Sequence, residues 1–77
     1  MALYGLLITS GMYNRAQTIY IKAPDRQAAI NKAKKRRGVR SIQNVHEIDP
    51  LYIKRERKIY RWWLKENSEV YVERKRR

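Results

Sequence analysis

A short acidic stretch beside the single histidine is the part of this chain whose residue types come closest to a catalytic or metal site. His46 precedes Glu47, and Asp49 follows two residues later. Paired carboxylates can hold a metal ion or exchange protons with a substrate. No second cluster supports them, since the chain has no other histidine and no cysteine. We therefore expect no enzyme, no metal site and no cofactor, and interpret these acids as solvated charges at the end of a strand.

Basic residues are the stronger chemical signal. Lysine and arginine total 19 against 7 acidic residues, which gives a formal net charge of +12. Such a surplus creates a positive field that attracts phosphate backbones, anionic membranes or acidic protein surfaces. The positive residues gather in two internal clusters and a terminal run at residues 74–77. The first run of cations begins at Lys32, and its members that we expect to hold phosphate, termed the first basic cluster, are Lys34, Lys35, Arg36, Arg37 and Arg40. The second basic cluster comprises Lys54, Arg55, Arg57, Lys58 and Arg61.

Aromatic residues are interleaved with the second basic cluster. Tyr52, Tyr60, Trp62 and Trp63 all fall in or beside it. Single-stranded or looped nucleic acid is bound by this combination, because π faces stack on bases while cations hold the backbone. We predict that Trp62 or Trp63 stacks on bases. One of the two is expected in the core, because neighbours in a strand point to opposite faces and the chain has no phenylalanine to fill its interior.

The elements that must position these clusters begin with a hairpin. Residues 3–10 and 15–22 are short runs rich in strand-forming residues, separated by a turn that begins with Gly11. Pro24 ends the second run and Asp25 is a good helix N-cap. The residues from 26 to 37 favour a helix with residues 34–37 in its last turn and Gly38 after its end. Residues 39–48 predict a third strand with a bulge near Gln43 and Asn44, because the apolar alternation changes phase there.

Two structures fit the residues after Pro50. Runs at 58–64 and 69–75 flank a polar tetrapeptide and favour a second hairpin, whereas apolar spacing between 53 and 66 also fits a helix. We favour the hairpin, because Val70, Tyr71 and Val72 require a strand partner. The expected fold is α+β: an antiparallel β-β-α-β sheet with one helix on one face and a C-terminal β-hairpin or helix. Residues 1–73 would form a single small domain, and residues 74–77 a mobile basic tail.

Cellular context follows from composition. The start of the chain lacks the features of a secretory signal, and no apolar run approaches the roughly 18 residues that a membrane span needs. Absence of cysteine fits a reducing compartment, so we expect a cytoplasmic protein. Membrane binding is the least favoured use of the charge, because apolar residues are scarce outside the expected core. A homodimer is compatible with the exposed edges of a small sheet.

The expected function is non-catalytic nucleic-acid binding in a ribosomal or regulatory role, with RNA preferred to DNA because no segment resembles a helix that reads the major groove. The alternative is a phage- or plasmid-type effector that binds an acidic surface of a host protein. From Ile19 to Ile48, a strand ending in alanine, a capped helix, a basic turn and an isoleucine-rich strand follow one another. This stretch, less than half of the chain, loosely resembles small archaeal ribosomal proteins.

Overall fold

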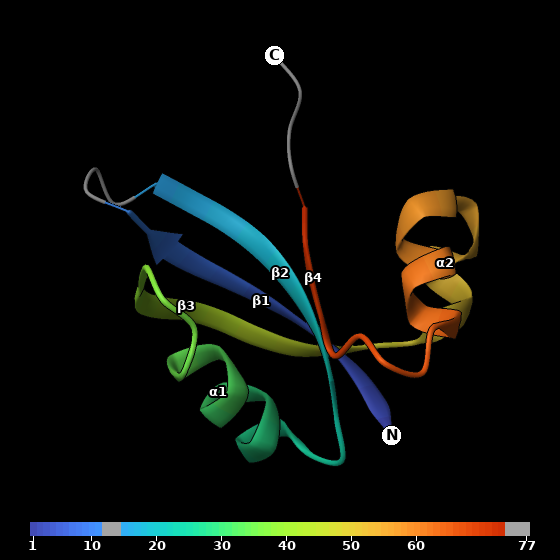
Figure 1. The fold of residues 1–77 in the computed structure, drawn as a ribbon, viewed down its shortest axis with the longest axis horizontal. Helices are drawn as coiled ribbons and strands as arrows, with labels where there is room; N and C mark the ends of the chain where they lie inside the picture. Colours follow the sequence, from blue (N-terminus) through green and yellow to red (C-terminus); the bar gives the residue numbers. More distant parts are fainter. Residues whose placement is uncertain (12–14, 74–77) are drawn as a thin grey trace.

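The computed structural model describes residues 1–11 and 15–73. Two long strands, β1 (Ala2–Ser10) and β2 (Arg15–Ala23), lie at the centre of a four-stranded antiparallel sheet (Figure 1). The strand β3 (Val39–Ile48) pairs with the free side of β1, and the short strand β4 (Val70–Val72) pairs with the free side of β2. The sheet order is β3-β1-β2-β4. The predicted α+β class with an antiparallel sheet is confirmed.

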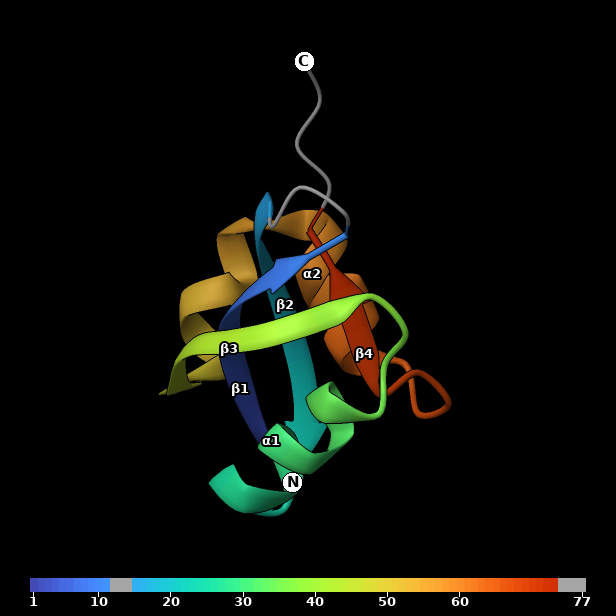
Figure 2. The ribbon, with the colours of Figure 1, turned by 90° about the vertical axis from the view of Figure 1, so that its left-hand side faces the viewer.

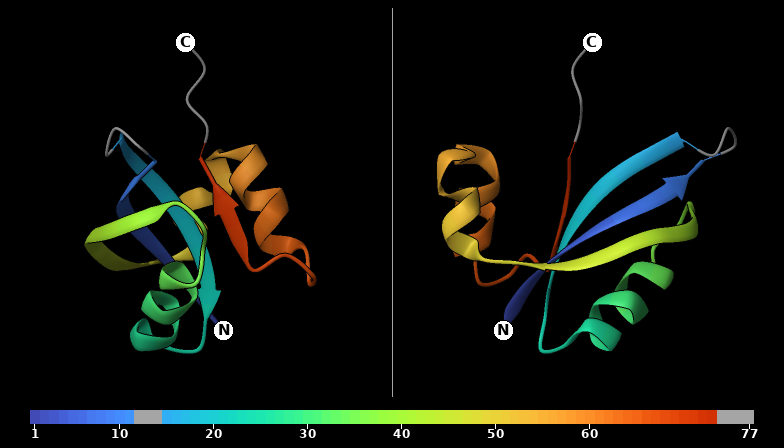
Figure 3. Two further views of the ribbon diagram at one scale, coloured as in Figure 1. Left: turned by 60° about the vertical axis from the view of Figure 1, so that its left-hand side comes forward. Right: turned by 180° about the vertical axis from the view of Figure 1, so that it is seen from behind.

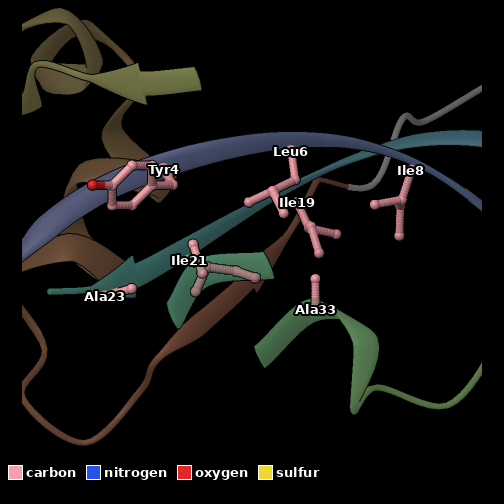
Figure 4. Packing of buried hydrophobic residues seen from close by; sticks show 8 residues of the cluster. Tyr4, Leu6, Ile8, Ile19, Ile21, Ala23 and Ala33 are labelled. Carbon is pink, nitrogen blue, oxygen red and sulfur yellow. The ribbon is translucent and has the colours of Figure 1, made fainter. Parts of the chain in front are cut away.

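Alternation along β1 and β2 gives the sheet two different faces. On one face Leu6 and Ile8 of β1 and Ile19 and Ile21 of β2 are buried together (Figure 4). The helix α1 (Arg26–Lys34) covers this face and contributes Ala33 to the same core. Small residues on α1 allow the helix backbone to approach the sheet closely, which explains why a helix with so narrow an apolar stripe can complete a core.

The helix α1 begins as predicted and ends earlier than predicted. Asp25 is its N-cap, and the Asp25 carboxylate accepts a hydrogen bond from the Ala28 N–H at 2.8 Å. The helix ends at Lys34, so the expectation that it extends to residue 37 is wrong. The following residues form a turn that leads into β3, with Gly38 at φ +85°. Its carbonyl accepts a hydrogen bond from the Gly11 N–H at 3.1 Å, which ties this turn to the end of β1.

The predicted bulge in β3 is confirmed. Leu7 pairs with Asn44 whereas the next residue, Ile8, pairs with Ile42, so Gln43 is the additional residue. A second irregularity in the pairing lies between Thr9 and Ser10 of β1, opposite the start of β3. The first bulge restores the apolar phase, because it lets both Ile42 and Val45 pack against the core beneath α1.

The prediction of a C-terminal hairpin is wrong. A 3₁₀ helix, η1 (Pro50–Arg55), is followed by α2 (Arg57–Leu64), so the segment 58–64 is helical. Within the second predicted run, 69–75, residues 70–72 form the strand β4, but this strand pairs with β2. The helix is preferred because Ile59 and Trp62, three residues apart, fall on one side of it and are buried together. In a strand these two side chains would point to opposite faces.

The second core lies on the other face of the sheet, at the end where β1 begins. Leu3, Ile53, Ile59 and Trp62 are buried in it, and Tyr20 packs at its side. The helices α1 and α2 therefore lie on opposite faces of the sheet (Figures 2 and 3). Within the described part of the chain, no helix combines the length and the apolar character needed to cross a membrane.

Candidate functional site

The first basic cluster lies at the end of α1 and in the turn before β3. All of its side chains are exposed. Beside it, a groove of about 600 Å³ runs between α1 and the edge strand β3. Lys34, Arg40 and Arg26 line this groove, together with apolar side chains such as Ile30 and Val39. Arg26 was not among the predicted site residues. It joins Lys34 because the two are eight residues apart on a helix and so lie near one face.

The second basic cluster is carried by η1 and α2. Its members are likewise exposed. Between α2 and β4 lies a groove of about 500 Å³, lined by Lys58, Arg61 and Lys65 on the helical side and by residues of β4, including Tyr71, on the other. Lys65 was likewise not among the predicted site residues. Because residues 57–64 are helical and Lys65 directly follows them, Lys65 lies four residues from Arg61 and seven from Lys58 and so falls on the same side of the helix.

The two tryptophans have different environments. Trp62 is 5% exposed and belongs to the second core, where its indole N–H donates to the Ser68 hydroxyl at 3.0 Å. Its ring packs against Tyr71 with 5.7 Å between the ring centroids. Trp63 is only partly buried at the edge of the same core. Of the two, Trp63 is the one with surface available for stacking.

A buried lysine, Lys22, holds α2 against the sheet. It is 7% exposed and lies on the α2 face of β2. The Lys22 ammonium donates to the carbonyl of Trp62 at 3.0 Å and to the carbonyl of Lys65. These carbonyls close the C-terminal end of α2, where a positive charge interacts favourably with the helix dipole. The ammonium also lies 5.0 Å from the Trp62 ring centroid and 5.7 Å from that of Trp63.

Burial lowers the pKa of Lys22 from its ordinary value. The cation is nevertheless well placed, since two carbonyl dipoles and two aromatic faces replace part of its hydration. Lys22 and Tyr20 are two residues apart in β2 and so share a face of the sheet, but nothing in the sequence indicates that this face is covered. Only the packing of α2 shows that Lys22 is a structural residue and not part of the basic surface.

Most of the positive charge is not neutralised at close range. Within residues 1–11 and 15–73 one ion pair forms, between the Lys32 ammonium and the Glu69 carboxylate at 3.4 Å. The same ammonium donates to the Lys22 carbonyl at 2.8 Å, so Lys32 links α1 to the sheet. Neither basic cluster takes part in an ion pair in this part of the structure. Their side chains are available to an external anion.

The acidic stretch does not come together as a site. On β3, His46 lies opposite Gly5 and Glu47 lies opposite Tyr4, so the two side chains belong to opposite faces of the sheet. The Asp49 carboxylate accepts from the Leu51 N–H at 3.0 Å and caps η1. Among the described residues, no group of three or more histidine, aspartate and glutamate side chains could hold a metal ion.

The chain matches no family model, no curated protein and no solved structure. The resemblance of residues 19–48 to small ribosomal proteins stays a prediction.

Proposed function

We propose that this protein binds nucleic acid and does not catalyse a reaction on it. The observation that carries the proposal is the set of exposed cations of the two basic clusters, which form no ion pair within the described residues. Each cluster also adjoins a groove between a helix and an edge strand. Cations grouped in this way gain little from one another and gain much from a polyphosphate backbone, which releases its counterions when they bind.

We favour single-stranded or looped RNA within this class. The groove between α2 and β4 is lined by Tyr71 and the largely buried Trp62 beside Lys58 and Arg61, whereas Trp63 lies partly exposed on α2 and does not line this groove. This arrangement supplies both a stacking surface and phosphate contacts, and unpaired bases can use both. A ribosomal or regulatory role in the cytoplasm fits such a protein.

Affinity for a short single-stranded RNA, measured over a range of salt concentrations, tests the proposal. We expect binding to weaken steeply with salt, by a slope of about 0.7 per phosphate contacted on a logarithmic plot. The triple variant Lys58→Gln, Arg61→Gln, Lys65→Gln should reduce that slope by about 2. Arg15→Gln is the matched control, because Arg15 is exposed but lies in neither basic groove, and its slope should remain that of the unaltered protein.

Two results would contradict the proposal. Failure to bind RNA or DNA even at low salt would exclude nucleic acid and favour an acidic protein surface as the partner. Equal affinity for duplex DNA and single-stranded RNA would remove the preference for unpaired RNA while leaving nucleic-acid binding in place.

A further inference from the structure

The two basic clusters face away from each other. The first cluster follows α1, which covers the sheet face formed by Leu6 and Ile8. The second lies on η1 and α2, which pack against Leu3 on the opposite face of the sheet. Because successive residues of a strand point to opposite faces, α1 and α2 are separated by the full thickness of the sheet. Figure 3 shows the two helices on either side of it.

The clusters are also separated along the sheet. Arg40 lies at the start of β3, and Lys54 follows its end by a few residues. A strand of ten residues spans about 33 Å at about 3.3 Å per residue. Electrostatic interactions in about 0.1 M salt decay over about 10 Å. The two clusters therefore act as separate charges.

Among the described residues, the strands of the sheet between the clusters offer little positive charge to a backbone that would cross them, and Arg26 lies on the same side as the first cluster, in the groove beside α1. The central strand β1 contains no charged residue. The neighbouring strand β2 has Arg15 at its far end and Lys22, which is buried. On β3 the charged residue beyond Arg40 is Glu47, which would repel a phosphate. One short nucleic-acid segment can gain full contact with one cluster but not with both.

We propose that each molecule joins two nucleic-acid segments, one on the first basic cluster and one on the second. The inference rests on the proposed function, because it assigns the same class of ligand to both clusters. A protein built in this way brings two strands, or two distant parts of one strand, to opposite sides of a sheet. Its activity would be bridging or compaction of nucleic acid, in addition to simple binding.

The experiment uses the full chain and single-stranded RNA oligonucleotides whose extended length is less than that of β3. Half of the oligonucleotides carry a donor dye and half carry an acceptor dye. Two variants each neutralise one cluster. The first replaces the five cations of the first basic cluster with glutamine, and the second does the same to the five of the second basic cluster. All of these side chains are exposed, so circular dichroism should show that both variants remain folded.

The unaltered protein should bind two oligonucleotides per molecule and produce energy transfer between the dyes. Each variant should bind one oligonucleotide and produce no transfer. An equimolar mixture of the two variants should also give none, since each molecule in it has one functional cluster. Transfer restored in the mixture would show that bridging arises between associated copies and would overturn the proposal.

Failure of this inference can be distinguished from failure of the proposed function. If the unaltered protein binds one oligonucleotide and gives no transfer, bridging is excluded while nucleic-acid binding remains. If either variant still bridges, the two clusters are not the two contacts. If the unaltered protein binds no oligonucleotide, both proposals fail together.

Discussion

A lysine side chain inside this basic protein has a role unlike that of the lysines on its surface. Lys22 donates to the carbonyls of Trp62 and Lys65 and so fixes the end of α2 to β2. Part of the second basic cluster lies on that helix, and the contacts of Lys22 therefore help to set where Lys58 and Arg61 lie. Positioning of the exposed cations depends on a buried one.

Lys22→Met should lower the free energy of unfolding by about 1–3 kcal/mol, because it leaves the two carbonyls without their buried donor while keeping a side chain of similar shape. Urea unfolding measures the change. Lys35→Met is the matched control, since Lys35 is exposed, and should change stability by no more than about 0.5 kcal/mol. Equal effects of the two substitutions would show that the Lys22 contacts contribute nothing.

The lowered pKa of Lys22 predicts a dependence of stability on alkaline pH. At pH values between the pKa of Lys22 in the folded protein and its ordinary pKa of 10.5, Lys22 keeps its proton in the unfolded chain but has released it in the folded protein. The free energy of unfolding contributed by Lys22 therefore rises with pH in this interval. The stability difference between the unaltered protein and Lys22→Met should widen from neutral pH toward 10.5. A constant difference in urea titrations across that range would contradict this.

The tryptophans allow packing and binding to be separated. Trp63→Leu keeps an apolar side chain but removes the partly exposed π face, so we expect affinity for single-stranded RNA to fall by about 1–3 kcal/mol. Trp62→Leu is the comparison, because it removes a buried ring and its hydrogen bond to Ser68. It should lower stability by up to about 3 kcal/mol with little change in the affinity of the folded protein. Titration and urea unfolding distinguish these results, and the opposite pattern would make Trp62 the stacking residue.

At the scale of elements, α1 depends on a cap that the sequence identified. Asp25→Ala should lower the free energy of unfolding by about 1 kcal/mol, since the Ala28 N–H loses its acceptor. Glu47→Ala, at an exposed position on β3, provides the control and should have a much smaller effect. Chemical denaturation of both variants measures the difference. A cost for Asp25→Ala no greater than for Glu47→Ala would show that the cap is not stabilising.

Local signals were enough to predict the first three strands and the start of α1. The cap at Asp25 and the phase change at Gln43 each act on neighbouring residues, and the structure places a helix start and a bulge there. The predicted turn after Gly11 falls on residues 12–14, which lie outside the described residues, as does the predicted tail at 74–77. The end of α1 was placed too late, because lysine and arginine after Lys34 favour a helix in isolation. The turn that connects to β3 overrides that preference.

Non-local pairing explains the error after Pro50. The strand β4 does need a partner, but that partner is β2, about fifty residues earlier in the chain. A search for the nearest strand-like run therefore assigned 58–64 wrongly. The cations of the two basic clusters were predictable from charge alone, but Arg26 and Lys65, which also line the grooves, were not. The grooves were not, because each is formed between a helix and an edge strand that only the folded chain brings together.

For the molecule as a whole, the surplus of positive charge opposes compaction. A net charge of +12 on 77 residues, offset by one ion pair within the described residues, raises the free energy of the folded state by self-repulsion. Screening by salt reduces this repulsion, and a polyanion that binds the folded state more tightly than the unfolded chain would reduce it further. The same salt that stabilises the fold is expected to weaken nucleic-acid binding.

Thermal unfolding in increasing sodium chloride should therefore show a rising midpoint temperature, and addition of a polyanion such as polyphosphate at low salt should raise it more than the same concentration of phosphate. Calorimetry or circular dichroism measures both. An uncharged crowding polymer at equal mass concentration controls for excluded volume, which has only a weak effect. A midpoint that falls with salt would show that attractive surface charges outweigh repulsion.

The hydrogen bond from the Gly11 N–H to the Gly38 carbonyl gives the molecule an internal reporter. The amide belongs to the end of β1, whereas the carbonyl belongs to the turn that carries the first basic cluster. Exchange of this one amide proton with deuterated solvent therefore measures how often that turn opens, without any label on the turn itself. A ligand that steadies the turn would slow the isotope exchange at Gly11, although Gly11 carries no charge and no side chain to touch it.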